Sequence, residues 1–245
     1  MPCQMAVRGS FTESFPLFGY DLKDYEALFD EKLDLLQLAN ESTKVNWQGQ
    51  LTQSIAGKEV YPRPVQDKLP LWVATGGHVE STVKIARARL PIVYAIIGGN
   101  PRYFKKLIQA YREIGRDAGH ADKDLKVGAH SWGWIAEDGE QAVKDYFHPT
   151  KQVVDAISKD RPHWQELTYE QYLEQVGPNG AMFVGNPDQV AEKLIRMIED
   201  LDLDRFMLHL PLGSMPHDQV LRAIELFGTQ VAPQIRAYFA MKEGS

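Results

Sequence analysis

Leu69-Pro-Leu-Trp-Val-Ala-Thr-Gly-Gly-His-Val-Glu-Ser81 is the stretch of this sequence that decides the fold. Its apolar run, residues 71–74, is typical of a parallel strand that is covered on both faces. Two glycines form a turn, and a helix is expected over about residues 79–89. A helix start offers unpaired backbone N–H groups and a partial positive charge, so the stretch predicts an anion site that suits a phosphate.

Further apolar runs of the same kind occur on both sides of this stretch. They predict strands at residues 3–7, 91–97, 126–136 and 205–210, with helices between them. Strands that alternate with helices through short crossovers favour an α/β fold with a parallel sheet and right-handed connections. Ligands of such folds bind at the carboxyl ends of the strands.

The length of 245 residues suits an eight-stranded barrel, yet only five strands of the barrel type are convincing. The remaining length lies in two excursions, residues 11–68 and residues 137–186, of which the second separates the last two strands. No change in composition suggests a boundary, so residues 1–245 are expected to form a single domain.

The composition is that of an ordinary globular protein, with 44% hydrophobic and 24% charged residues. The net charge is −6 and no basic run is present, which disfavours nucleic-acid binding. No apolar segment approaches the length of a membrane span, and no signal peptide is visible. The single cysteine, Cys3, allows no internal disulfide and favours a cytoplasmic protein.

Three glycine-containing turns supply candidate binding residues. Thr75-Gly76-Gly77 permits close approach of an anion to the backbone, and Ser81 adds a hydroxyl in the first helical turn; a plain strand-to-helix turn is the alternative. Gly98-Gly99 repeats this pattern one strand later. Arg8-Gly9-Ser10 places a forked cation at a strand end, where an anion could be chelated, although a surface arginine is the simpler interpretation.

The histidines form no metal-binding motif, so a metal site is not expected. His130 and His209 lie within two of the expected strands, where they either contact a ligand or are satisfied core residues. Trp132 and Trp134 are expected in the core. No serine or cysteine occupies a nucleophile elbow, and no catalytic acid or base is assigned.

Several segments, in a fixed order, carry a resemblance to a known family. They are Val7-Arg-Gly-Ser-Phe-Thr-Glu-Ser-Phe-Pro-Leu-Phe-Gly-Tyr-Asp-Leu22, Tyr61-Pro-Arg-Pro-Val65, Leu71-Trp-Val-Ala-Thr-Gly-Gly-His-Val-Glu-Ser81, Leu90-Pro-Ile-Val-Tyr-Ala-Ile-Ile-Gly-Gly99 and Val184-Gly-Asn-Pro187. Together they resemble the bacterial luciferase-like flavin monooxygenases over nearly the whole chain. The resemblance implies a TIM-type (β/α) barrel that binds FMN at the carboxyl ends of its strands.

The family's chemistry implies further expectations. Reduced FMN, often supplied by a separate flavin reductase, reacts with O₂ and oxidises a small organic substrate. The cofactor-binding residues that the resemblance implies are Arg8, Gly9, Ser10, Thr75, Gly76, Gly77, His78, Ser81, Ile97, Gly98 and Gly99.

The chain also departs from the family pattern. The family has three strand–helix units before the Arg8-Gly9-Ser10 segment, so an incomplete barrel of about five of eight units is expected here. Its open edges would be covered by a homo- or hetero-oligomeric partner or by a rearranged segment, or the chain is a truncated product. Two alternatives to a monooxygenase therefore stand: a non-catalytic flavin-binding or assembly subunit, and an oxidoreductase that uses the deazaflavin F420.

Overall fold

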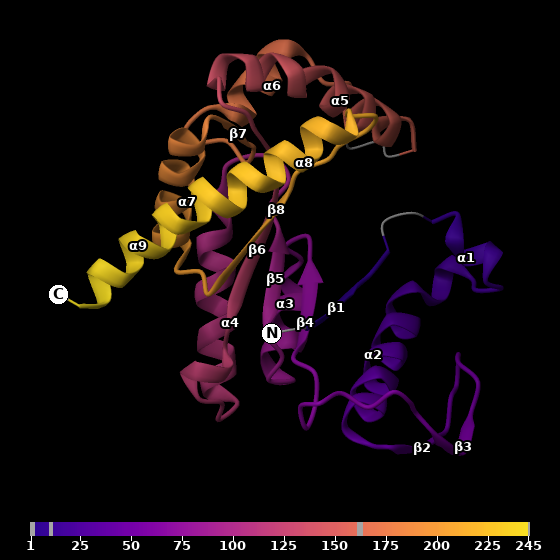
Figure 1. Ribbon diagram of the computed structural model, residues 1–245. Helices are drawn as coiled ribbons and strands as arrows, with labels where there is room; N and C mark the ends of the chain where they lie inside the picture. The colour runs from indigo at the N-terminus through magenta and orange to yellow at the C-terminus, as the bar shows by residue number, and fades with distance from the viewer. Residues whose placement is uncertain (1–2, 10–11, 161–163, 245) are drawn as a thin grey trace.

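A parallel sheet forms the centre of the computed structural model, which describes residues 3–9, 12–160 and 164–244 (Figure 1). The five expected strands are present and lie in the order β1-β4-β5-β6-β8. Their bounds are β1 Gln4–Val7, β4 Leu71–Thr75, β5 Ile92–Ala95, β6 Val127–Ile135 and β8 Arg205–His209. A sixth short strand, β7 Phe183–Gly185, pairs in parallel with the last residues of β6. The predicted α/β class and the count of five barrel strands are confirmed.

The sheet is curled into a half-barrel, and one contact identifies its concave face. The guanidinium of Arg205 on β8 lies 4.7 Å from the ring centroid of Trp72 on β4, although β5 and β6 separate these strands. Three strand intervals span about 14 Å in a flat sheet, beyond the reach of an arginine, so the strands must bend toward one another. Parallel register partners share a face, which places Met5, Val93 and His130 on this concave side as well.

The convex face is covered by helices, and the main apolar core lies there. Strand residues of the opposite parity, such as Ile92 and Tyr94, are fully buried against Ile85 of α3 Val79–Arg87 and Ile108 of α4 Lys105–Asp117. The buried hydroxyl of Tyr94 has a partner, since it lies 3.1 Å from the Thr82 hydroxyl. The remaining helices of this layer are α7 Pro187–Leu201, α8 His217–Leu226 and α9 Ala232–Glu243.

The first excursion contains α1 Ser14–Leu17, α2 Tyr25–Glu41 and an antiparallel hairpin of β2 Lys44–Trp47 and β3 Ile55–Glu59. The hairpin stands at the outer end of α2 in Figure 1. The Glu31 carboxylate joins the two parts, because it accepts backbone N–H groups from Gln50, Leu51 and Thr52. At the carboxyl end of α2, the Arg63 guanidinium donates to the main-chain carbonyls of residues 39, 40 and 42.

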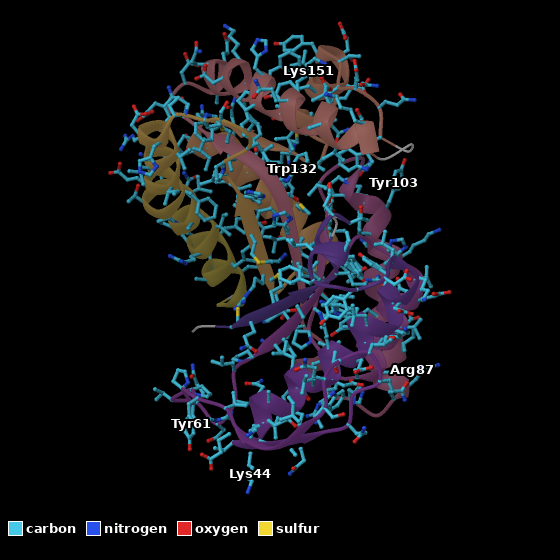
Figure 2. The ribbon with its side chains drawn as sticks, turned by 90° about the vertical axis from the view of Figure 1, so that its right-hand side faces the viewer. Lys44, Tyr61, Arg87, Tyr103, Trp132 and Lys151 are labelled. Carbon is cyan, nitrogen blue, oxygen red and sulfur yellow. The ribbon has the colours of Figure 1, made fainter. Side chains whose placement is uncertain are left out.

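The second excursion contains α5 Gly139–Asp160 and α6 Tyr169–Val176, beyond the carboxyl end of β6 at the top of Figure 1. The Trp134 ring of β6 stacks on Tyr146 of α5, and both are buried, as expected for Trp134. Trp132 is also buried and lies in the middle of the molecule, whereas Lys44 and Tyr61 lie at its outer end (Figure 2). Within the described residues, none of the helices combines the length and apolar character needed to cross a bilayer.

Candidate functional site

Two of the predicted residues, 73 positions apart in sequence, are in direct contact. Arg8 follows β1 and Ser81 lies in the first turn of α3, and Arg8 Nη2 donates to Ser81 Oγ over 2.5 Å. The contact arises because β1 pairs directly with β4, so the residues that follow both strands meet at one edge of the sheet. The Arg8 side chain is only 14% exposed, which holds its guanidinium in place.

Of the two glycines in the turn between β4 and α3, Gly77 is required by the backbone, whereas Gly76 has free space around it. Gly77 has a φ of +102°, and a Cβ placed on it would lie 2.9 Å from Cε1 of Phe104. Gly76 has no atom within 4 Å of an added Cβ, so its backbone faces open space. Thr75 is buried beneath this turn. The turn therefore presents exposed backbone to an approaching ligand.

The amino end of α3 is not capped by a side chain. His78 is the N-cap residue and makes no capping hydrogen bond. The first N–H groups of an α-helix have no partner within the helix, so those of α3 are available to an anion. Together with Arg8 and the Ser81 hydroxyl, they supply the donors that a phosphate monoester requires.

A cavity of about 370 Å³ opens at this point. Its lining includes two cations, Arg8 and Lys84, and two carboxylates, Glu26 and Glu80. Glu26, on α2, forms an ion pair with Arg8 through Nη1. Sequence reasoning missed Glu26 and Lys84, because their positions depend on how α2 and α3 lie beside one another. A carboxylate already held by Arg8 shows that this position accepts an oxyanion.

The other predicted residues lie near this cavity or at neighbouring strand ends. The carbonyl of Gly9 accepts a hydrogen bond from the Tyr25 hydroxyl of α2, and Ser10 lies outside the described residues. Ile97, Gly98 and Gly99 follow β5 and do not line the cavity. Ile97 packs partly against the core, and both glycines are exposed.

His130 and His209 come together at the carboxyl end of the concave face. Their ring centroids are 5.6 Å apart, on the neighbouring strands β6 and β8. Burial, and then the charge of His209, lower the pKa of His130, and burial lowers the pKa of His209. Both rings are therefore neutral at pH 7, when each has one nitrogen that donates and one that accepts.

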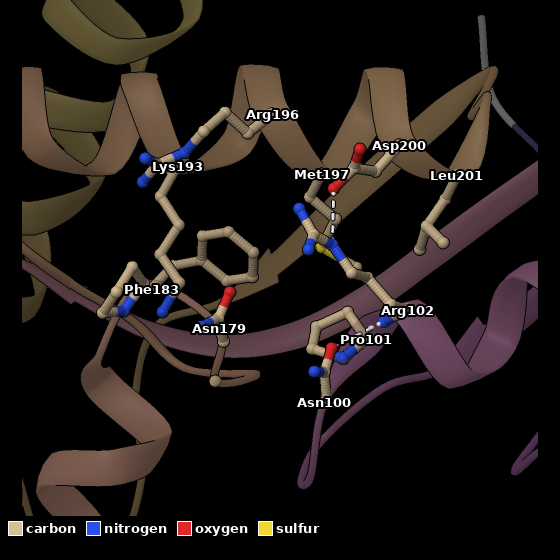
Figure 3. A pocket seen from close by; sticks show the side chains of 12 residues that line it. Asn100, Pro101, Arg102, Asn179, Phe183, Lys193, Arg196, Met197, Asp200 and Leu201 are labelled. Atoms are coloured by element: carbon tan, nitrogen blue, oxygen red, sulfur yellow. Dashed lines mark hydrogen bonds and ion pairs between the residues drawn. The ribbon is translucent and has the colours of Figure 1, made fainter.

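A second cavity, of about 100 Å³, lies between α7 and the segment after β5 (Figure 3). Its charged side chains are already engaged. Arg102 pairs with Asp200 at 3.0 Å, and Lys193 Nζ donates to main-chain carbonyls, including that of Met182 at 2.6 Å. The helix start that lines this cavity is also capped by the Asn100 side chain, whereas the start of α3 at the β4–α3 turn is uncapped. In the described part of the chain, no group of three or more His, Cys, Asp or Glu side chains could hold a metal ion.

Comparison with known proteins identifies the relatives of this chain. A family model described as luciferase-like monooxygenase matches residues 5–204. Monooxygenase RslO1 from Streptomyces bottropensis is similar in structure, with a TM-score of 0.75 and 20% identity over 94% of this chain and 67% of that protein.

Two further solved structures differ in the cofactor that their descriptions name. The oxygenating constituent of 3,6-diketocamphane monooxygenase from Pseudomonas putida, in complex with FMN, has a TM-score of 0.62 and 15% identity over 93% of this chain and 69% of its own. The coenzyme F420-dependent tetrahydromethanopterin reductase from Methanopyrus kandleri has a TM-score of 0.63 and 15% identity over 95% of this chain and 74% of its own. At these identities the likeness establishes the fold, and the chain spans about two thirds to three quarters of the length of these relatives.

Proposed function

Because this chain belongs to the luciferase-like monooxygenase family, we propose that it is a flavin-dependent oxidoreductase that binds FMN at the β4–α3 turn. The observation that carries the proposal is the contact between Arg8 and Ser81 beside an uncapped helix start. Arg8 and Ser81 would hold the phosphate through side-chain donors, and the segment from Thr75 to His78 would add backbone donors. The exposed Gly98-Gly99 turn lies at the neighbouring strand end, where the rest of the cofactor would extend.

The fit between these residues and a phosphate rests on the donor set. Arg8 and Lys84 supply two positive charges at the mouth of the cavity, and Glu26 and Glu80 supply two negative ones. A phosphate therefore fits if it replaces the Glu26 carboxylate on Arg8. The exposed fraction of the Glu26 side chain, 63%, leaves it free to move into solvent.

The concave face would hold the reacting part of the bound molecules. When bound, reduced FMN supplies the electrons and the chemistry with O₂. His130 and His209, neutral at pH 7, would donate or accept a hydrogen bond at a substrate oxygen. The buried indole of Trp132, in register with His209, would exclude water from one side of that position. A small organic substrate, O₂ and a separate flavin reductase are the partners that this function needs.

F420 is the second candidate cofactor, because a structural relative that depends on F420 matches this chain as well as the FMN complex does. A non-catalytic flavin-binding subunit is the third possibility, and the open concave face favours it. Met5 and Val7, on the free edge strand β1, are exposed on that face, although Trp72, Val93 and Trp132 in its middle are buried.

A titration with FMN, reduced FMN and F420, combined with an oxygen-consumption assay that contains NAD(P)H and a flavin reductase, separates these functions. The proposal predicts saturable FMN binding and reductase-dependent consumption of O₂ when substrate is present. Binding without turnover over a panel of aldehydes, ketones and alkanes would support the subunit. Tighter binding of F420 than of FMN would identify F420 as the cofactor. Binding of none of the three would refute a flavin function.

A further inference from the structure

The two amino groups of Arg8 have different partners. Nη2 donates to Ser81 Oγ at 2.5 Å, whereas Nη1 pairs with the Glu26 carboxylate. The arginine is nearly buried, with 14% of its side chain exposed, and the glutamate is largely exposed at 63%. The fixed partner is therefore the cation, and the replaceable partner is the carboxylate.

The Glu26 carboxylate lies near two helix starts. Glu26 is in the first turn of α2, and Ser81, which shares Arg8 with it, is in the first turn of α3. Both helix starts attract negative charge. One turn further along α2, Asp30 pairs with Lys84 of α3 at 2.6 Å, which keeps the two helices in this relation. The carboxylate consequently occupies the place on Arg8 where the anion of a ligand would bind.

We propose that Glu26 is a specificity-determining residue, whose carboxylate holds Arg8 until a phosphate group displaces it. The inference rests on the proposed FMN function and concerns the same site. Two anions that share one arginine repel each other, so the phosphate must replace the carboxylate. This exchange weakens the binding of a flavin that carries a phosphate, and it leaves riboflavin, which carries none, unaffected. Glu26 thereby sets how strongly the site prefers FMN to riboflavin.

The size of the effect follows from the exposure of the pair. Exchanging a largely exposed ion pair changes an affinity by about two- to fivefold. Glu26→Gln removes the charge and retains an oxygen that can accept from Arg8, so the helix contact is preserved. Asp34→Asn is a matched control. Asp34 lies two turns further along α2 and lines the groove between α2 and α3, yet it forms no ion pair with the described residues.

The test is fluorescence titration of the full chain with FMN and, separately, with riboflavin. We expect Glu26→Gln to bind FMN about two- to fivefold more tightly than the wild type, with riboflavin affinity unchanged. Asp34→Asn should leave both affinities within error of the wild type. Equal FMN affinity in wild type and Glu26→Gln, or an equal gain in Asp34→Asn, would overturn the role of Glu26 while leaving FMN binding intact. If the wild type and Glu26→Gln both fail to bind FMN, the proposed function itself fails, and the inference fails with it.

Discussion

Arg8 shows how far individual residues of the site could be predicted. A strand followed by Arg8-Gly9-Ser10 and a strand followed by Thr75-Gly76-Gly77 predict donors at one sheet edge, and the structure brings Arg8 to Ser81. The pairing with Glu26 could not be predicted, because it depends on the rotation of α2 and not on any local pattern. The meeting of His130 and His209 depends on the register between β6 and β8, which the sequence does not encode in an obvious way.

The two glycines after β4 have separable roles. Gly77→Ala should lower the free energy of unfolding by about 1–2 kcal/mol, because it places a Cβ at positive φ and against Phe104. A loss of that size corresponds to a drop in Tm of roughly 2–8 °C. Gly76→Ala has open space around its Cβ, so the Tm should stay within 1–2 °C of wild type. Differential scanning fluorimetry measures both, and an equal drop in the two variants would contradict the account.

The hydrogen bonds of Glu31 should make the stability of the β2–β3 hairpin depend on pH in acid. Its hydrogen bonds from Thr52 and from the backbone of residues 50–52 lower the pKa of Glu31 to about 2. A carboxyl group with a lowered pKa stabilises the folded state above its ordinary pKa of 4.5, and this contribution is lost as the pH falls toward 2. Hydrogen exchange of residues 44–59 should therefore accelerate below about pH 4.5 relative to the sheet.

Glu31→Gln supplies the control for that measurement. The variant should exchange faster in the hairpin at pH 7, and it should lose the additional acceleration in acid, because the amide does not titrate. An acid response that is identical in wild type and Glu31→Gln would show that another group is responsible.

At the level of elements, the strands were easier to predict than the excursions. Continuous apolar runs identified all five barrel strands. A strand that is buried on both faces is apolar along its whole length, so it can be recognised from its own residues alone. The helical segment at the end of the chain contains a π-helical turn, Phe227–Val231, between α8 and α9. Pro233, two residues later, cannot donate a backbone hydrogen bond, and the wider turn accommodates it before α9 continues. Pro149 likewise lies inside α5 without ending that helix.

Lys193 connects α7 to the end of the second excursion. Its side-chain nitrogen donates to the carbonyls of Val176, Gly177 and Met182 at 2.9, 2.6 and 2.6 Å, in the segment from the end of α6 to the start of β7. Lys193→Met should remove the shared donor of these partly buried carbonyls and lower the free energy of unfolding by about 2–3 kcal/mol in urea denaturation. Lys151→Met is the control, since Lys151 donates to a single main-chain carbonyl, that of Leu167, and otherwise pairs with Asp155. A smaller loss of unfolding free energy in Lys193→Met than in Lys151→Met would contradict this role of Lys193.

At the scale of the whole molecule, the apolar runs predicted the number of strands, whereas the curl was expected only from the resemblance to a barrel family, and the structure confirms it. The curl brings Arg205 over Trp72, and it follows from strand twist and from helix packing on one face only. The concave side is the less covered one. Met5 and Val7 on β1 are 39% and 60% exposed, and Arg205 forms no carboxylate ion pair with the described residues.

This open face predicts association or dye binding. Exposed apolar residues on a sheet with free edges favour contact with another surface. The full chain should elute above its monomer mass of 27.8 kDa in light-scattering chromatography, or bind the dye ANS if it remains a monomer. Val7→Thr should reduce either response. A monomer that binds no ANS would show that the face is covered.

The central claim, that Arg8 and the β4–α3 turn hold the phosphate of FMN, is tested most directly by the dissociation constant for FMN in wild type and Arg8→Ala. Loss of charge-assisted hydrogen bonds to a phosphate should weaken binding by about 10- to 100-fold. Arg116→Ala removes an exposed arginine that pairs with Asp122, so its dissociation constant should match the wild type. An FMN affinity in Arg8→Ala equal to that of wild type, with the fold intact by circular dichroism, would contradict the account.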